Sequence, residues 1–341
     1  MIPAIFGCSG PELTADERAF FRDADPAGYI LFGRNCQSPQ QLRALTDDLR
    51  AIHGRDRLLI SIDQEGGRVA RLRPPHWGSY PTGEAFDRLY KIAPASAIQA
   101  ARLSARAMAL ELSAMGITVD YHPPLDLRQP GAHDVIGDRA FGEDPVQVAA
   151  IGRAVLEGLA EGGVAGCIKH MPGHGRSMVD SHREMPTVRE SAEELERDLA
   201  PFRSLAGTAR IGMTGHLLFP VWDAQNPATL SPTIIKEVIR GAIGFDGLLL
   251  TDDIDMEALS DSIPQRSARA VAAGCDVVLN CWAKMDDMTG TCEVLPAMGE
   301  TALARLDRAL EETRVAEALG PEHGDLMAER DALLALAGET A

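Results

Sequence analysis

The amino-acid sequence predicts an α/β fold with one domain, a (β/α)8 barrel of the TIM type. Eight short apolar runs recur along the 341 residues, and patterns typical of helices separate most of them. Strand and helix patterns that alternate in this way indicate a parallel sheet, and eight repeats indicate that the sheet closes on itself. A single barrel of this kind commonly reaches the length of this chain.

The eight apolar runs are the expected strands. They cover residues 4–8, 29–32, 58–62, 118–122, 164–168, 211–218, 248–251 and 277–279. Between the first two, residues 10–28 contain only a short helical pattern. Clearer helices are predicted over 98–115, which ends at Gly116, and over 145–159, where Asp144 can cap the first turn. We expect residues 1–318 to form the barrel domain and residues 319–341 to form a C-terminal helix or a tail.

Composition limits the possible partners and the compartment. The net charge of −17 argues against a nucleic-acid partner, whose phosphates would be repelled. None of the six cysteines forms a CxxC pair, which indicates free thiols in a reducing compartment. The first residues lack the basic start of a signal peptide, and no stretch approaches the ~20 apolar residues of a membrane helix. We therefore expect a cytoplasmic protein with no membrane partner.

Titratable side chains are most concentrated in residues 168–186, IKHMPGHGRSMVDSHREMP. A strand pattern precedes it, and a capping box of Ser191 and Glu194 marks the start of a helix after it. It therefore connects a strand to a helix. Its titratable side chains gather near the carboxyl end of the strand: Lys169, His170, His174, Asp180 and His182.

Polar residues also follow most of the other expected strands, at the end of the barrel where active sites lie. They are Asp63, Asp126, His216, the run Thr251-Asp252-Asp253, and Asn280. Asp63 directly ends a strand and is placed to grip a ligand hydroxyl. We interpret Glu65 as a solvated charge in a glycine turn and Asp126 as a loop support. His216 fits a core histidine and a site residue equally well. Asp276, at a strand start, is interpreted as structural.

Two chemistries fit the histidine-rich loop. Three histidines and an aspartate could hold a metal ion. However, their spacings are irregular, and Lys169 would oppose a cation. In the second interpretation, Asp180 and His182 point the same way from an extended segment, so the carboxylate orients the imidazole as a general acid/base.

The acid/base pair needs a nucleophile opposite it, and Asp252 or Asp253 can supply one. Neighbouring strand residues point to opposite faces, so we expect only one of the two to act. Retaining glycoside hydrolases use a carboxylate nucleophile that faces a general acid/base. The acid/base is usually a second carboxylic acid, and here a histidine would replace it.

Several motifs carry a resemblance to a known family. The run KHMPGHGRSMVDSH closely resembles the KHFPGHG…DSH signature of the β-N-acetylhexosaminidases of glycoside hydrolase family 3. DQEGGRVARL, IGDRAFGEDP, GMTGHLLFP, GFDGLLLTDDIDMEAL and AGCDVVLNC are also similar to that group, so the resemblance covers roughly residues 25–285. It implies Asp252 as nucleophile, His182 as general acid/base and Asp180 as its orienting partner. It further implies that the N-acetylglucosamine ring is held by Asp63, Arg71, Arg139, Lys169 and His170, and that His174 supports the loop.

The resemblance implies a retaining exo-β-N-acetylglucosaminidase that needs no metal or organic cofactor. Its small-molecule substrate would be a cytoplasmic muropeptide, N-acetylglucosamine linked to 1,6-anhydro-N-acetylmuramic acid with or without peptide, in peptidoglycan recycling. We expect a monomer or a weak homo-oligomer. Three alternatives stay open: a phosphorylase of the same family, a metal-dependent barrel hydrolase, and a non-catalytic sugar-binding protein.

Overall fold

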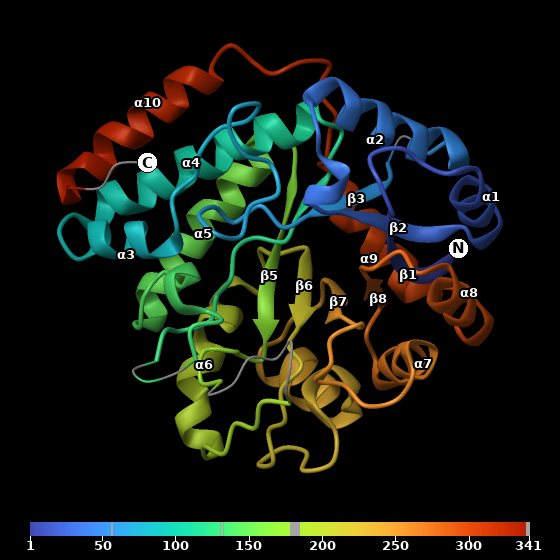
Figure 1. Cartoon of the computed structure of the whole chain (residues 1–341). Helices are drawn as coiled ribbons and strands as arrows, with labels where there is room; N and C mark the ends of the chain where they lie inside the picture. Colours follow the sequence, from blue (N-terminus) through green and yellow to red (C-terminus); the bar gives the residue numbers. More distant parts are fainter. Residues whose placement is uncertain (56, 130, 132, 178–184, 339–341) are drawn as a thin grey trace.

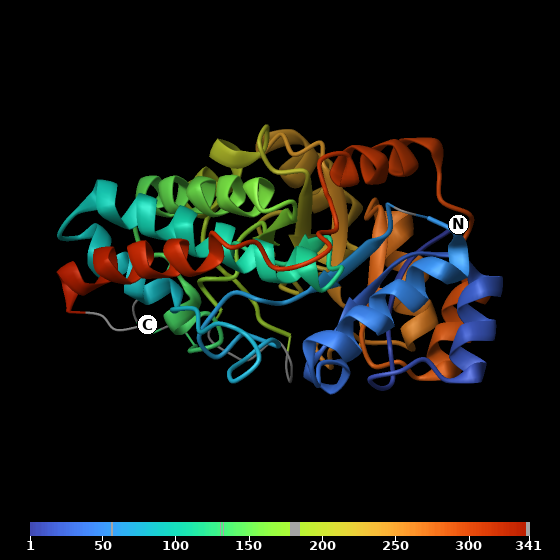
Figure 2. The same cartoon turned by 90° about the horizontal axis from the view of Figure 1, so that it is seen from above.

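The computed structural model describes residues 1–55, 57–129, 131, 133–177 and 185–338. Eight parallel strands close into a barrel in chain order, which confirms the predicted fold (Figures 1 and 2). The strands are β1 Ile2–Gly7, β2 Pro26–Leu31, β3 Leu59–Ile62, β4 Val119–Asp120, β5 Ala165–Met171, β6 Ile211–Thr214, β7 Leu248–Asp253 and β8 Val277–Asn280. The first strand pairs with both β2 and β8 and so closes the barrel.

Helices surround the strands in Figure 1. They are α1 Ala15–Ala24, α2 Pro39–His53, α3 Gly83–Tyr90, α4 Pro94–Ala114, α5 Pro145–Glu161, α6 Ala192–Leu205, α7 Ile263–Ala273, α8 Met285–Val294, α9 Glu300–Leu310 and α10 His323–Leu334. Short 3-10 turns are η1 Gly33–Asn35, η2 Gly137–Arg139, η3 Ala228–Leu230 and η5 Ala335–Ala337, and η4 Ile234–Ala242 is a π-helix.

The expected strands differ from the observed ones mainly at their ends. The fifth strand runs on to Met171, so Lys169 and His170 lie within β5 rather than after it. The sixth is shorter than expected and ends at Thr214, and β4 has only two residues. The local apolar pattern marks the runs, but pairing with the neighbouring strands decides where each strand ends.

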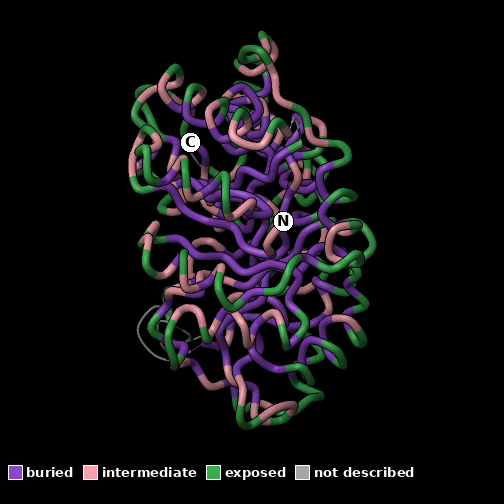
Figure 3. The backbone as a smooth tube through the Cα atoms, turned by 90° about the vertical axis from the view of Figure 1, so that its right-hand side faces the viewer, coloured by how far each residue is buried: buried purple, intermediate pink, exposed green. Residues whose placement is uncertain are grey.

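Alternating strand residues divide the core into two buried clusters. Ile5, Leu59, Ile211 and their counterparts on the other strands form the cluster inside the barrel. Met298 and residues of α9, such as Leu306, also belong to it. Phe6, Ile60 and the apolar faces of the helices form the larger cluster between barrel and helices. Figure 3 shows this arrangement as buried backbone through the middle of the molecule and exposed turns at its edge. This is the pattern that period-two side-chain alternation produces in a barrel.

The predicted helix ends are present. The Ser191 hydroxyl accepts a hydrogen bond from the Glu194 amide at 3.3 Å, and the Glu194 carboxylate accepts one from the Ser191 amide at 2.9 Å. Asp144 accepts a bond from the Val146 amide at 2.7 Å at the start of α5. Gly116 follows α4 with φ +78°, a conformation that favours glycine.

The C-terminal segment contains α10, which packs against α3 and α4 on the outside of the barrel (Figure 2). A division between a barrel domain and a tail at residue 318 stays a prediction. All six cysteines are free, four of them buried. Within the described residues, no helix combines the length and the apolar composition required to cross a membrane.

Candidate active site

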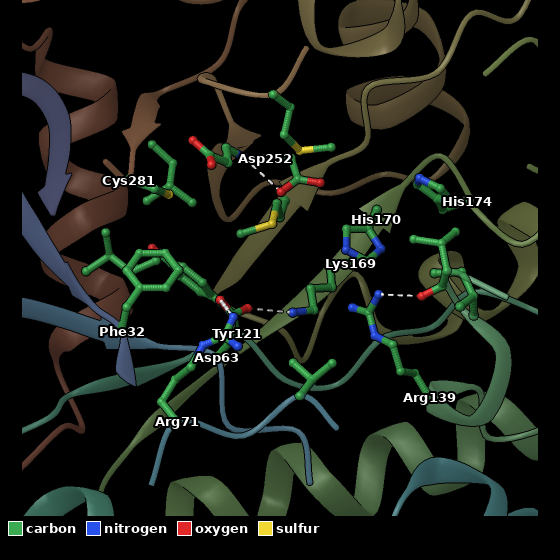
Figure 4. A pocket seen from close by; sticks show the side chains of 18 of the residues that line it. Phe32, Asp63, Arg71, Tyr121, Arg139, Lys169, His170, His174, Asp252 and Cys281 are labelled. Carbon is green, nitrogen blue, oxygen red and sulfur yellow. Dashed lines mark hydrogen bonds and ion pairs between the residues drawn. The ribbon is translucent and has the colours of Figure 1, made fainter. Parts of the chain in front are cut away.

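A pocket of about 280 Å³ opens where the carboxyl ends of the strands meet. Figure 4 shows polar side chains from several strand ends around one space, with Asp252 in its upper part and Asp63 and Arg71 in its lower part. Six residues predicted from the sequence line the pocket: Asp63, Arg71, Arg139, Lys169, His170 and Asp252. Closure of the barrel therefore brings them together from the ends of three strands, β3, β5 and β7, and from the connections after β3 and β4.

Asp63, at the end of β3, binds two cations. One carboxylate oxygen accepts a hydrogen bond from Lys169 Nζ at 3.0 Å, and the other accepts one from Arg71 Nη2 at 3.1 Å. Burial alone would raise the pKa of Asp63, but Lys169 and Arg71 outweigh it and lower that pKa. The carboxylate is therefore ionised and held by two donors.

Glu65 corrects the sequence interpretation, because it is buried rather than solvated. Its carboxylate accepts two hydrogen bonds from Arg139, at 2.8 and 2.7 Å, and forms an ion pair with Lys169 Nζ at 2.7 Å. Burial would raise the pKa of Glu65, yet Arg139 and Lys169 hold that pKa well below its usual value. The glycine turn after β3 folds back, with bridges between Gly66 and Val69, and this places the carboxylate inside.

Asp126 is a loop support, as predicted. It is 1% exposed and accepts hydrogen bonds from the backbone amides of His170 and His174 at 3.3 and 2.6 Å. Its second oxygen lies 2.7 Å from His170 Nδ1. Since a carboxylate accepts, Nδ1 carries a proton and Nε2 of His170 is left for the pocket. The side chain of His174 also lines the pocket, and burial lowers its pKa to about 4.

The two aspartates at the end of β7 have different protonation states. Burial would raise the pKa of Asp252, but His170, His216 and the Asp253 amide lower it to about 2. That amide donates to Asp252 Oδ1 at 2.8 Å. Burial and the neighbouring Asp255 carboxylate raise the pKa of Asp253 to about 8. At neutral pH, Asp252 is an anion and Asp253 is protonated.

Both aspartates are among the residues that line the pocket, but their neighbours differ: Asp252 lies near His170 and His216, whereas Asp253 lies near Asp255 and Cys281. That they point to opposite faces stays a prediction. The register between β7 and β8 shifts between Leu250 and Asp253. An irregularity of this kind breaks the strict alternation of side chains at the end of a strand.

Two other strand-end residues stay out of the pocket. His216 is a buried, hydrogen-bonded core histidine, bonded to Thr229 at 2.8 Å and to the Asp253 carbonyl at 2.9 Å. Asn280 ends β8 but does not line the pocket. Asp276, as predicted, is structural: it pairs with Arg240 at 2.7 Å and Arg305 at 3.0 Å at the start of β8.

Asp180 and His182 lie outside the residues that the structure describes, so their roles stay predictions. Within the described ranges, no three histidine, cysteine, aspartate or glutamate side chains are arranged to hold a metal ion. The sequence interpretation also missed several pocket residues: Phe32, Tyr121, Met213, Met256 and Cys281. Phe32 and Cys281 each directly follow a strand, and this position could have indicated that they line the pocket. From sequence alone, however, an apolar residue at a strand end cannot be distinguished from a core residue.

A closed parallel barrel with an ionised carboxylate and paired cations at its strand ends is the arrangement typical of α/β-barrel enzymes that act on polar substrates. Comparison with known proteins makes this specific. Residues 8–317 match the model of the glycosyl hydrolase family 3 N-terminal domain. The β-hexosaminidases of Alkalilimnicola ehrlichii and Bordetella avium are 41% and 39% identical over 283 residues, which cover 82% of this chain and 80% of each relative.

A solved structure gives the same result at the level of the fold. NagZ from Neisseria gonorrhoeae in complex with N-trifluoroacetyl-D-glucosamine superposes with a TM-score of 0.86 at 32% identity, over 98% of both chains. The chain belongs to glycoside hydrolase family 3. The family suggested by the sequence motifs is confirmed, and the chain is a glycoside hydrolase of the β-N-acetylhexosaminidase type.

Proposed function

We propose that this chain is a retaining exo-β-N-acetylglucosaminidase that removes terminal N-acetylglucosamine from cytoplasmic muropeptides, with Asp252 as nucleophile. The β-hexosaminidase relatives and the glucosamine derivative bound by the Neisseria protein support the sugar. The muropeptide substrate and a role in peptidoglycan recycling rest on the resemblance of the motifs. We also propose that the enzyme works as a monomer or a weak homo-oligomer and needs no cofactor.

The paired charges in the pocket suit the recognition of a neutral sugar. Asp63, Arg71, Lys169 and Arg139 offer acceptors and donors on rigid elements, and His170 adds the ring nitrogen left by Asp126. Each cation already has a carboxylate partner, so the pocket can donate hydrogen bonds without carrying an excess of positive charge. Hydroxyl groups need such fixed donors and acceptors, since each bond to them is individually modest.

The observation that carries the proposal is the contrast between Asp252 and Asp253. A carboxylate nucleophile must be ionised, and the pKa of Asp252 lies at about 2 while that of Asp253 lies at about 8. The Asp253 amide occupies Asp252 Oδ1, so Oδ2 remains for the anomeric carbon. Asp252, the first aspartate of the pair, is therefore the better nucleophile.

In the proposed reaction, Asp252 Oδ2 bonds to the anomeric carbon as the glycosidic C–O bond breaks. His182, oriented by Asp180, gives its proton to the leaving oxygen. In the second step His182 takes a proton from water, the water oxygen bonds to the anomeric carbon, and Asp252 leaves as a carboxylate. Two inversions at one carbon retain the β configuration.

Trapping tests the nucleophile directly. A 5-fluoro N-acetylglucosamine analogue with a good leaving group should label one residue, and peptide mapping should identify Asp252. Asp252→Ala should abolish turnover, while Asp253→Ala should retain much of it. A label on another residue, or a more severe loss from Asp253→Ala, would contradict the assignment.

Product analysis tests the reaction and the substrate. Incubation with N-acetylglucosaminyl-1,6-anhydro-N-acetylmuramic acid in phosphate buffer should release free N-acetylglucosamine. A yield of the sugar 1-phosphate would instead favour the phosphorylase. Loss of activity with a chelator, restored by a divalent metal, would favour the metal-dependent hydrolase, and no cleavage of any N-acetylglucosaminide would favour a sugar-binding protein.

A further inference from the structure

His216 lies between the carboxyl end of β6 and the nucleophile-bearing end of β7. It is completely buried and makes two hydrogen bonds. Its Nε2 is 2.9 Å from the backbone carbonyl oxygen of Asp253, and its Nδ1 is 2.8 Å from the hydroxyl of Thr229. It does not line the pocket, so it has no direct contact with the substrate space.

The two bonds define the protonation of the imidazole. A carbonyl oxygen can only accept, so Nε2 carries the proton and donates it to Asp253. Burial lowers the pKa of His216, although Asp252 and the Asp253 carbonyl oppose that effect. The ring is therefore neutral at physiological pH, and Nδ1 accepts from the Thr229 hydroxyl. The Asp253 carbonyl therefore fixes the tautomer, and the Thr229 hydroxyl, which can donate or accept, is the partner of Nδ1.

The bond to Asp253 replaces a missing part of the sheet. Strand β6 pairs with β7 at Ile211, Gly212 and Met213, opposite Leu248, Leu249 and Leu250, and it ends at Thr214. Strand β7 continues to Asp253, beyond the last paired residue. The imidazole N–H therefore donates to a carbonyl beyond the paired part of β6, and the Met256 amide donates to the same carbonyl at 3.1 Å.

The backbone of Asp253 links this histidine to the nucleophile. Its carbonyl accepts hydrogen bonds from the side chain of His216 and from the Met256 amide, and its own amide donates to Asp252 Oδ1 at 2.8 Å. Fixing this residue fixes the direction of the amide, and the amide both orients the Asp252 carboxylate and stabilises its ionised form. A small misplacement of a reacting group costs much rate.

We propose that His216 is a positioning residue for the glycosidase reaction, which acts through the Asp253 backbone to aim Oδ2 of Asp252 at the anomeric carbon. The inference rests on the proposed role of Asp252 as nucleophile. Other titratable groups face Asp252 from neighbouring elements: Lys169 and His170 on β5, and His174 in the loop after it. They are unchanged in the variants below, so they contribute equally to each pH profile.

Two amide variants separate the two hydrogen bonds of His216. The side-chain nitrogen of His216→Gln can take the place of Nε2 and donate to the Asp253 carbonyl. The amide of His216→Asn lies where Nδ1 was, so it can bond Thr229 but cannot reach Asp253. Both variants place a polar amide of similar character in the same buried position, and a thermal unfolding curve for each shows the folded fraction.

We expect His216→Asn to lower kcat by about 10–100-fold, the usual effect of losing an outer support of a reactive group, with KM within about threefold of the parent. The acid limb of kcat/KM should move to higher pH, because Asp252 loses its fixed amide donor. His216→Gln should recover most of kcat and the parent pH profile. Thr229→Val removes the hydrogen-bond partner of His216 Nδ1, so it should shift both quantities in the same direction by less.

The proposal is overturned if His216→Asn keeps the parent kcat and acid limb, or if His216→Gln is no better than His216→Asn at equal folded fraction. If both amide variants fail to fold, an unchanged kcat and pH profile in Thr229→Val overturns it, and a shift supports it. A separate result, retained turnover in Asp252→Ala, would instead refute the proposed nucleophile.

Discussion

Glu65 binds two cations that line the pocket. It accepts a bidentate pair of hydrogen bonds from Arg139 and forms an ion pair with Lys169. Lys169 is buried and the side chain of Arg139 is only 12% exposed, so each would be costly to leave without its counter-charge. Glu65 therefore sets the position of two side chains proposed to hold the sugar, although it does not itself line the main pocket.

The first prediction concerns this residue. Glu65→Gln should lower the free energy of unfolding by about 3–5 kcal/mol, since it leaves two buried cations partly uncompensated. It should also raise KM for an N-acetylglucosaminide more than it lowers kcat. Urea unfolding and steady-state kinetics measure these effects. Asp48→Asn removes the exposed pair with Arg18 and serves as the control, with a cost below about 1 kcal/mol. Equal costs for the two variants would contradict the buried network.

The second prediction concerns the raised pKa of Asp253. In the unfolded chain this carboxyl releases its proton near pH 4, whereas in the folded protein it keeps the proton up to about pH 8. The folded state thus binds more protons between these values, and stability is lost as the pH rises through this window.

The asparagine of Asp253→Asn does not titrate, so this variant should not lose stability as the pH rises through this window. Its stability relative to the parent should increase by more than about 1 kcal/mol between pH 4 and pH 8 and then level off. Urea unfolding at pH 4, 6, 8 and 9 provides the measurement. A difference that does not change with pH would show that Asp253 is ionised in the folded protein.

At the scale of elements, the strand-to-helix connection after β5 packs closely on the one after β4. Gly175 lies so near the carbonyl of Leu127 that a Cβ at this position would overlap it. The same contact region holds Asp126, which fixes the amides of His170 and His174. A glycine in this loop is thus required by close backbone approach rather than by a positive φ.

The third prediction follows from this contact. Gly175→Ala should force the two loops apart, with a loss of about 1–3 kcal/mol in stability and a larger loss in kcat/KM, because His170 would move with its loop. Gly207→Ala is the matched control, since a Cβ there meets no atom within 4 Å. Thermal unfolding and kinetics of both variants decide it, and a neutral Gly175→Ala would contradict the packing.

At the scale of the whole molecule, α10 is tied to the barrel by a buried arginine. Arg330 is 1% exposed, donates to the Ser79 carbonyl at 3.0 Å and lies over the Tyr80 ring. The Tyr80 carbonyl in turn accepts a bond from the Gly67 amide at 2.9 Å. The C-terminal helix therefore supports Ser79 and Tyr80, and Tyr80 in turn holds the turn at Gly67 that precedes Arg71.

The fourth prediction is that Arg330→Ala lowers the free energy of unfolding by about 2–4 kcal/mol, through lost packing as well as lost hydrogen bonds. The kcat/KM of the folded enzyme should stay within about twofold, because Arg330 lies away from the pocket. Arg203→Ala, which removes an exposed pair with Glu196, should change stability by less than about 1 kcal/mol. Similar curves for both variants would mean that α10 is only loosely attached.

The sequence by itself determined the barrel, its strand order and the main charged residues that meet in the pocket. Apolar runs mark the strands, and carboxyl ends of parallel strands must gather at one end of a closed barrel. Asp63, Lys169, His170 and Asp252 follow from that rule together with the motif, since each lies at or near a strand end.

Only the tertiary structure decided the partners of these residues and their protonation. Glu65 meets Arg139 across 74 positions of chain, and His216 meets Asp253 across 37. Such contacts depend on register, where a shift of one residue turns a side chain to the other face. The protonation of Asp252 and Asp253 also depends on the tertiary structure. A pKa is set by burial and by neighbouring charges, and only the closed barrel brings those charges together.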